Sequence, residues 1–304
     1  MSNKRPVIAL VGATATGKTA LSVALAKALR GEVINADSMQ FYRGMDIGTA
    51  KATAAERQGV AHHLLDIYDL NVEASVATFQ HMARQKIADI RSRGHAPILT
   101  GGSGLYVRAA LDTLEFPPTN AQLRQQLTDQ VAEDGTAALV AELRRVDPES
   151  ADRLHDARRI IRAVEVYRLT GRPFSSYMPQ REYQPMIPPV LQVGLRIDRA
   201  VLHDRIAQRV HQMIERGWLE EVQHLKAQGL AQAPTASRAI GYKQMLAYLA
   251  GEQTLAEATE ATIVATRRFA RRQETWFKAD PRVHWIDAES QHAVEQITAL
   301  LASD

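Results

Sequence analysis

The chain has 304 residues, of which 45% are hydrophobic and 23% are charged, values typical of a globular protein with one large or two modest domains. It has no cysteine, which excludes disulfides, thiolate metal sites and cysteine nucleophiles, and its net charge of +3 is too small to indicate nucleic-acid binding by itself. No apolar run approaches the roughly 18 residues that span a bilayer, and no signal-peptide pattern precedes the first strand-like run. We therefore expect a cytoplasmic protein without membrane contact.

The first part of the chain predicts a parallel α/β sheet. Continuous apolar runs alternate with stretches of helical spacing, as in strands that are buried on both faces and joined by crossover helices. We expect strands over 6–12, 32–37 and 96–102, and helices over 19–30 and 73–93. Ligands of open α/β sheets sit beyond the C-terminal ends of the strands. The loops that follow these ends should therefore converge on one crevice; they are 12–19, 37–43 and 101–106.

Two proline-marked breaks, at 115–120 and 177–189, separate the middle of the chain from the rest. Between them the pattern is helical, and Thr119 or Asn120 could cap the first helix. The expected domains are the first part of an α/β core at 1–114, a mostly helical insertion domain at 115–189 and the second, largely helical part of the core at 190–304. In that last part we expect a strand over 190–198, a helix over 200–228 bent near Gly217, helices over 242–250 and 254–279, a strand over 282–287 and a terminal helix.

Residues 12–19, GATATGKT, fit the phosphate-binding pattern G-x-x-x-x-G-K-[ST]. Gly12 and Gly17 allow successive backbone N–H groups to point at an anion, and the following helix adds its positive N-terminal end. Lys18 supplies a charge for the outer phosphates, and Thr19 supplies a hydroxyl ligand for magnesium. The loop specifies a diphosphate-like group with magnesium, but it does not specify a nucleotide.

The position of the acidic residues departs from that of an ordinary P-loop NTPase, in which a strand ends in an aspartate that holds magnesium. The third strand ends instead in Thr100 and glycines. The best-placed carboxylate is Asp37, at the end of the second strand; Asp198 is a less well placed alternative. Asp37 could hold magnesium through water, act as a general base, or cap a turn.

Further segments, spread in order along the chain, carry a specific resemblance. They are DSMQFYRGMDIGTAK (37–51), HHLLD (62–66), LTGGSGLY (99–106), RRIIRAVEVY (158–167), ERGWLEE (215–221) and AIGYKQ (239–244). With the P-loop, this ordered set resembles the bacterial tRNA dimethylallyltransferase (tRNA isopentenyltransferase) family over nearly the whole chain. The resemblance implies a P-loop α/β fold. It also implies transfer of the dimethylallyl group of dimethylallyl diphosphate to the exocyclic amine of the adenosine 3′-adjacent to the tRNA anticodon, with diphosphate as the leaving group.

The resemblance also implies roles for individual residues. Asp37 matches the family's proposed general base, Arg216 matches an arginine directed at the diphosphate, and Lys18 assists the reaction from the P-loop. Mg²⁺ is the implied cofactor, with Thr19 as its ligand. The diphosphate would be held by Gly12, Ala13, Thr14, Ala15, Thr16, Gly17, Lys18 and Thr19. Binding of the tRNA anticodon stem-loop would involve Asp37, Ser38, Met39, Gln40, Ser103, Arg124, Arg158, Arg159, Ile160, Ile161, Arg162, Ala239, Ile240, Gly241, Tyr242, Lys243, Gln244, Arg272 and Lys278.

Two positions depart from the family pattern. Ser103 stands where the family usually has threonine, so the hydroxyl is kept and a methyl group is lost. His155 replaces an expected asparagine, next to the arginines of segment 158–167. His62 and His63 also match a family motif, but adjacent histidines do not face one centre, so we expect packing and hydrogen bonding rather than a metal site.

Two basic helical segments, 158–172 and 267–278, suit an anionic partner. Arginines at 267/271 and 268/272 are i,i+4 neighbours, and like charges at that spacing destabilise a helix unless an anion compensates them. Other functions remain open: a small-molecule kinase with the same loop, a prenyltransferase that acts on free adenylate, or a non-catalytic RNA-binding module. No obligate protein partner is expected.

Overall fold

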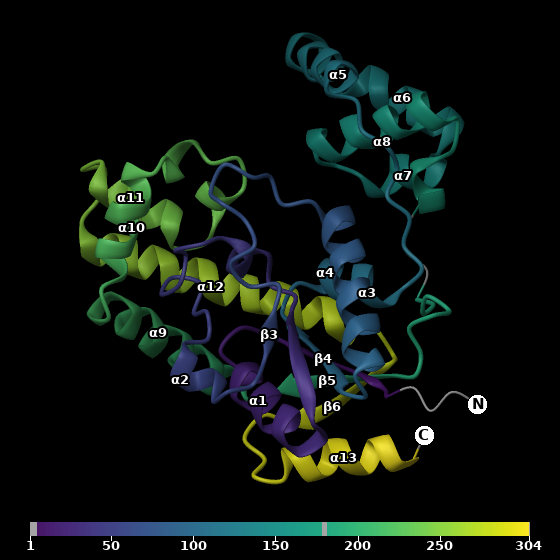
Figure 1. Ribbon diagram of the computed structural model, residues 1–304. Coiled ribbons are helices and arrows are strands. Elements are labelled where there is room, and N and C mark those ends of the chain that lie inside the picture. The colour runs from purple at the N-terminus through teal and green to yellow at the C-terminus, as the bar shows by residue number, and fades with distance from the viewer. Residues whose placement is uncertain (1–4, 178–180, 304) are drawn as a thin grey trace. The chain divides into compact units, whose positions relative to one another are not determined.

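A computed structural model describes residues 5–177 and 181–303 of the protein (Figure 1). The chain divides into two compact units: Met1–Leu111 with Pro185–Asp304, and Asp112–Gln184. The expected insertion domain, 115–189, overlaps the second unit, which begins and ends a few residues earlier. Residues 178–180, within the second proline-marked break, lie outside the described part of the chain.

The larger unit is built on a parallel six-stranded sheet of order β3-β2-β4-β1-β5-β6, which confirms the predicted α/β core. Its strands are β1 (Val7–Gly12), β2 (Gly31–Asn35), β3 (His62–His63), β4 (Ala96–Gly101), β5 (Val190–Arg196) and β6 (Val283–Asp287). The central strand β1 pairs Ile8 with Ile98 of β4 and with Leu191 of β5. Every residue of β1 is buried, which explains why its sequence is apolar throughout.

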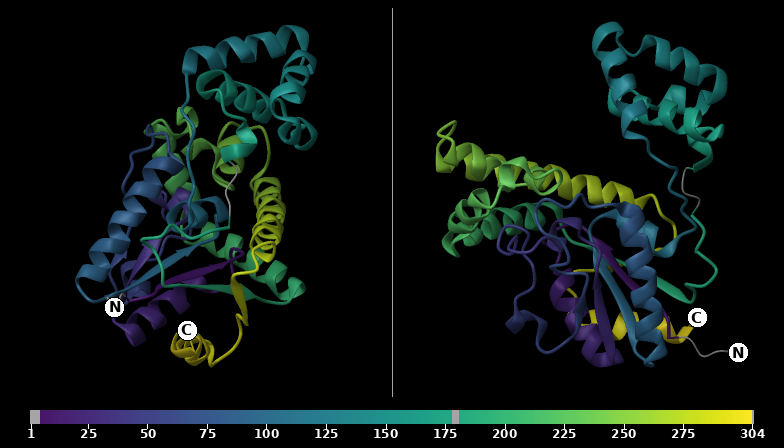
Figure 2. Two further views of the ribbon diagram at one scale, coloured as in Figure 1. Left: turned by 90° about the vertical axis from the view of Figure 1, so that its right-hand side faces the viewer. Right: turned by 45° about the horizontal axis from the view of Figure 1, so that its top comes forward.

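Helices cover both faces of this sheet (Figure 1, Figure 2). Ile8 and Leu10 of β1 pack in one cluster with Leu25 of α1 and Ile297 of α13, while α12 contacts β1 and α4 on the other face. The helices of this unit are α1 (Lys18–Leu29), α2 (Ala54–Arg57), α3 (Val76–Ser92), α4 (Gly104–Leu111), α9 (Arg199–Glu215), α10 (Trp218–Ala227), α11 (Tyr242–Leu249), α12 (Leu255–Lys278) and α13 (Ala293–Ser303). Among the described residues, none of these helices is long and apolar enough to cross a bilayer.

Several element boundaries differ from the sequence-based expectation. The helix expected over 200–228 is two helices, α9 and α10, because Gly217 takes a left-handed conformation (φ 91°) that ends one and starts the other. Helix α1 ends at Leu29 with Arg30 as its C-cap (φ 52°), and β2 begins at Gly31, one residue before the expected start of that strand. Strand β3 was not predicted, since two residues are too few to produce a periodic pattern.

The smaller unit is helical, with its own apolar core. It contains α5 (Ala121–Asp134), α6 (Ala137–Val146), α7 (Pro148–Arg153) and α8 (Ala157–Thr170). Leu127, Leu139, Leu143 and Val164 from three of these helices form the centre of the core. Asn120, rather than Thr119, caps α5 by accepting a hydrogen bond from the Leu123 N–H at 2.9 Å.

Candidate active site

The loops that follow β1, β2 and β4 converge on one cavity of about 330 Å³ in the larger unit. The P-loop contributes Thr14 and Ala15, the turn after β2 contributes Asp37, and the turn after β4 contributes Ser103. Helices α9, α10, α11 and α12 and the segments 48–49 and 238–240 complete the wall. This arrangement follows from a parallel sheet, whose strand C-termini meet at one edge.

The P-loop has the backbone geometry of an anion cradle. Gly17, with φ 88°, precedes the first turn of α1, and Ala15 also takes a left-handed conformation with φ 63°. The Thr16 hydroxyl donates to the Ala13 carbonyl at 2.9 Å, and the Lys18 ammonium donates to the same carbonyl. Burial lowers the pKa of Lys18 to about 7, with a further lowering by Arg209 that Asp37 opposes. An anion in the loop would compensate this lysine.

Gln273 of α12 joins two of the converging loops. Its Oε1 accepts the backbone N–H of Thr14 at 2.9 Å, and its Nε2 donates to the Gly102 carbonyl at 3.0 Å. The side chain is buried. Sequence reasoning missed this residue, because segment 267–278 was considered only for its charges. Because this contact occupies the N–H of Thr14, an anion would be bound by the N–H groups that follow Thr14 in the loop.

Asp37 is held in place at the end of β2. Its Oδ1 accepts the Met39 N–H at 3.0 Å, and Asn35 bonds both the N–H and the carbonyl of Asp37. Burial raises the pKa of the Asp37 carboxyl, although the Met39 N–H, Lys18 and Arg209 oppose the rise. The aspartate therefore caps the short helix Ser38–Phe41 and also presents a carboxyl with a raised pKa to the cavity.

An arginine that sequence reasoning did not select lies beside the P-loop. Arg209 of α9 lines the cavity, and one of its guanidinium nitrogens donates to the Thr14 hydroxyl at 3.3 Å. Arg216, the arginine selected from the sequence, lies at the C-terminal end of α9, where it is exposed and does not line the cavity. Two helical turns separate the two residues. Arginines are common on exposed helix faces, so the sequence offered no signal for Arg209.

Comparison with known proteins places this site in a family. A family model described as IPP transferase matches residues 40–280. The chain belongs to the IPP transferase family. A tRNA dimethylallyltransferase of Kocuria rhizophila is 58% identical over 294 residues, which cover 97% of this chain and 93% of that protein.

Solved structures of the IPP transferase family agree with this assignment. A full-length tRNA isopentenylpyrophosphate transferase of Bacillus halodurans is 42% identical, with a TM-score of 0.73, and the match covers 99% of this chain and 96% of that one. A eukaryotic dimethylallyltransferase acting on tRNA is 28% identical with a TM-score of 0.83, covering 98% of this chain and 78% of that one. The resemblance stated from the sequence motifs is thereby confirmed.

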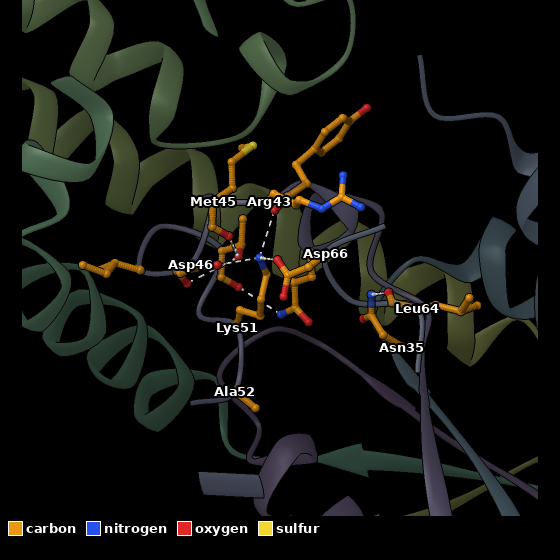
Figure 3. Close-up of polar contacts among 12 residues, drawn as sticks. Asn35, Arg43, Met45, Asp46, Lys51, Ala52, Leu64 and Asp66 are labelled. Carbon is orange, nitrogen blue, oxygen red and sulfur yellow. Dashed lines mark hydrogen bonds and ion pairs between the residues drawn. The ribbon is translucent and has the colours of Figure 1, made fainter. Parts of the chain in front are cut away.

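In this member of the IPP transferase family, a buried lysine holds the segment after Asp37 in place through a hydrogen bond and two ion pairs (Figure 3). The Lys51 ammonium donates to the Tyr42 carbonyl at 2.9 Å and pairs with the carboxylates of Asp46 and Asp66, both at 2.5 Å. Gln40, one of the predicted tRNA-binding residues, donates from its amide to the Thr49 carbonyl at 3.1 Å. That amide therefore supports the loop itself.

A second anchor of the same loop comes from α10. The Glu221 carboxylate accepts the backbone N–H groups of Asp46, Ile47 and Gly48, at 2.9, 2.6 and 3.2 Å. The same carboxylate accepts the Tyr242 hydroxyl at 2.6 Å. Hydrogen bonds therefore connect the loop to α10, and through Glu221 to α11; these two helices contribute Trp218 and Tyr242 to the cavity wall.

The residues predicted to bind tRNA fall into three groups in the larger unit. Those that line the cavity are Asp37, Ser38, Met39, Ser103, Ala239, Ile240, Tyr242 and Arg272. Gln244 accepts the Gly241 N–H at 2.8 Å and so stabilises the start of α11, while Lys243 is exposed. Lys278 pairs with Glu274 at 2.6 Å and lines a separate hollow of about 150 Å³ between α9 and α12. Arg199, Arg267 and Arg271 line that hollow as well.

The helical unit separates its predicted tRNA-binding residues into exposed and structural ones. Glu165 is fully buried and pairs with both Arg124 and Arg162, at 2.9 Å each. The side chains of Ile160 and Ile161 are buried in the unit's core. Of the predicted residues in this unit, only two arginines at the start of α8 are exposed and have no side-chain ion pair in the described structure; they are Arg158 and Arg159.

The predicted metal ligand is a single hydroxyl side chain on α1. Thr19 is exposed in the first turn of α1. Among the described residues, no cluster of three or more histidines or carboxylates could hold a metal ion. Mg²⁺ is commonly bound by a few protein ligands together with substrate phosphates and water, which is the set that Thr19 and a diphosphate would supply.

Asp198, the alternative aspartate, instead caps α9 by accepting the Ala200 and Val201 N–H groups. His63, as expected, forms a hydrogen bond, to Glu32 at 2.6 Å.

Proposed function

We propose that this protein transfers the dimethylallyl group of dimethylallyl diphosphate to the exocyclic amine of the adenosine 3′-adjacent to the anticodon in tRNA, with release of diphosphate. One observation supports this most strongly: a phosphate loop and the raised-pKa carboxyl of Asp37 face a single cavity that also has an apolar part, lined by Ile206, Val210, Met213 and Trp218. An apolar surface beside a phosphate site suits an alkyl diphosphate. The names of the similar proteins, tRNA dimethylallyltransferase and tRNA isopentenylpyrophosphate transferase, point to the same reaction.

We assign the diphosphate end of the donor to the P-loop. The N-terminal end of α1, Lys18 and Arg209 supply positive charge there. We assign this role to Arg209 rather than Arg216, because Arg209 lines the cavity and donates to the P-loop residue Thr14. As the carbon–oxygen bond breaks, negative charge develops on the departing diphosphate. Fixed positive groups stabilise that charge without reorganising. Anion binding would also raise the pKa of Lys18 and keep it protonated.

We propose that Asp37 accepts the proton that the adenine amine loses. The amine is a weak nucleophile because its lone pair is delocalised into the ring, so a carboxylate that accepts its proton assists the new carbon–nitrogen bond. The raised pKa makes Asp37 a stronger base than an ordinary aspartate. After the transfer, the dimethylallyl carbon is bonded to nitrogen, the proton is on Asp37, and the diphosphate carries the electron pair of the broken bond.

A divalent metal belongs to the family's chemistry, and we propose Mg²⁺, held by Thr19 with the diphosphate. When bound, it would neutralise part of the charge of the leaving group. The adenosine must leave the stack of the anticodon loop to reach a cavity of this kind. We assign contacts with the tRNA backbone to Arg158 and Arg159, because a separate helical unit with exposed arginines at the start of α8 would serve no purpose with a free adenylate. We place the reaction in the cytoplasm, where tRNA is modified.

The test uses unmodified tRNA with either dimethylallyl diphosphate labelled in its alkyl group or ATP labelled in its γ-phosphate. We expect label in the tRNA from the first compound only. Label from ATP would instead support a kinase. Free AMP, assayed in parallel, should remain unlabelled; its labelling at the rate of tRNA would contradict the assignment of the helical unit.

A further inference from the structure

Part of the cavity wall is formed by apolar and aromatic side chains that are almost completely buried. Ile206 and Val210 of α9, Trp218 of α10 and Tyr242 of α11 all line the cavity, yet each has at most 3% of its surface exposed. Side chains that line a cavity while being this buried form its deep part. Hydrocarbon is the natural occupant of such a surface.

Helix α9 gives this part of the cavity a direction. Arg209 contacts the P-loop, Val210 and Met213 follow on the same helix and line the cavity, and Trp218 comes directly after the break at Gly217. Arg209 and Met213 are one turn apart, about 6 Å along the axis. A donor whose diphosphate lies at Arg209 would therefore extend its alkyl tail along α9 toward Trp218.

The indole of Trp218 is packed so that it cannot move aside. A Cβ atom at Gly48 would lie 2.1 Å from its Nε1, and one at Gly241 would lie 2.2 Å from its Cη2, so two glycine backbones approach the ring closely. The Tyr242 ring meets it edge to face at 5.7 Å. Glu221 in turn fixes both the Tyr242 hydroxyl and the Gly48 N–H. Close-packed interiors resist such displacement.

We propose that Trp218 sets the length of the prenyl donor, admitting a five-carbon tail and excluding a ten-carbon tail. This inference rests on the proposed function. A second isoprene unit would have to occupy the volume of the indole ring, and neither Gly48 nor Gly241 leaves space into which the ring could withdraw. Trp218 is thus a specificity residue that acts by shape alone, without contact to the reacting atoms.

The test compares Trp218→Leu and Trp218→Val with wild type, using dimethylallyl and geranyl diphosphate as donors and mass spectrometry of the tRNA nucleosides. In the variants, we expect the ratio of kcat/KM for the five-carbon donor to that for the ten-carbon donor to fall by at least about tenfold. Trp285→Leu is the matched control, since Trp285 lies on β6 outside the cavity and should leave the ratio unchanged. An unchanged ratio in Trp218 variants that still use dimethylallyl diphosphate would overturn the proposal.

A measurement on wild type covers the case in which these buried substitutions prevent folding. Geranyl diphosphate should inhibit dimethylallyl transfer no more strongly than inorganic diphosphate, because only its head group fits. Inhibition as strong as the binding of the five-carbon donor would overturn the proposal. If wild type fails to transfer the dimethylallyl group at all, it is the proposed function that fails, so the two failures are distinguishable.

Discussion

The side chain of Gln273 accepts the backbone N–H of Thr14 at 2.9 Å, across 259 residues of sequence. Its other amide atom donates to the carbonyl of Gly102 at 3.0 Å. Only an amide can accept at one end and donate at the other with this shape. The P-loop and the turn that carries Ser103 therefore share one buried support, which couples the phosphate end of the cavity to the side on which Asp37 lies.

Gln273→Glu should weaken this support, because a carboxylate cannot donate to the Gly102 carbonyl. We expect a loss of about 1–3 kcal/mol in the free energy of unfolding and a raised KM for the donor. Denaturant unfolding and steady-state kinetics measure the two effects. Gln232→Glu, at an exposed position, is the control and should change neither. Wild-type values for Gln273→Glu would show that the bridge contributes nothing to the site.

Substitutions of Arg209 and Arg216 should have different effects on kcat/KM for the donor. Arg209→Ala should lower kcat/KM for the donor by about 10²–10³, because it removes a cation from the developing diphosphate charge. Arg216→Ala should stay within a few-fold of wild type, since Arg216 is exposed and outside the cavity. The reverse order would restore the assignment made from the sequence motif.

The raised pKa of Asp37 predicts the acidic limb of the pH profile. A general base works only when it is deprotonated, so kcat/KM should fall with decreasing pH below a pKa that lies above the ordinary aspartate value of 3.8. Arg209→Gln should move the limb further upward, because the guanidinium lowers this pKa. Asp37→Asn should abolish turnover and leave tRNA binding largely intact. An acidic limb that persists in residual Asp37→Asn activity would assign it to another group.

The lowered pKa of Lys18 predicts that the affinity for inorganic diphosphate falls as the pH rises, the opposite direction to the pH dependence expected from Asp37. With a pKa of about 7 in the empty site, Lys18 must take up a proton when an anion binds at higher pH. Affinity should therefore fall between pH 7 and 9, with proton uptake visible by calorimetry in two buffers. Lys18→Arg stays charged throughout, so it should show only the titration of the ligand. Identical pH profiles for wild type and this variant would contradict the prediction.

The arginines of the helical unit should differ in function: some should bind RNA and one should stabilise the unit. Arg158→Ala with Arg159→Ala should weaken tRNA binding and reduce the slope of log K against log salt by roughly one to two, as expected for lost phosphate contacts. Arg162→Ala should instead destabilise the unit, because Arg162 pairs with the buried Glu165 and donates to the carbonyls of Pro117 and Pro118. An unchanged slope in the double variant would contradict the RNA-binding role of this unit.

What the sequence could predict depends on how far apart the contacting residues lie. The P-loop, its strand and its helix were predictable, because glycines, lysine and apolar runs act there within a few neighbouring residues. The same holds for Asp37, which directly follows β2. Arg209 and Gln273 were not predictable, because both reach Thr14 from distant helices and neither residue type is unusual on a helix.

The arginines of α8 show the same limit. Arg158, Arg159 and Arg162 look alike in the sequence. Arg162 pairs with Glu165 three residues further along the same helix, but only the packing of the unit shows that Glu165 is buried and that Arg162 is therefore structural. In the same way, nothing in the sequence near Trp218 indicates that the backbones of Gly48 and Gly241 enclose its ring.

Alkyl transfer to tRNA is tested most directly with dimethylallyl diphosphate labelled with ¹⁴C in the alkyl group and ³²P in the diphosphate, incubated with unmodified tRNA in a single turnover. We expect ¹⁴C to appear in the adenosine 3′ to the anticodon as an equal amount of ³²P is released as diphosphate, and we expect Asp37→Asn to show neither. Transfer of ³²P to the RNA, or full transfer of ¹⁴C by the Asp37→Asn variant, would contradict this expectation.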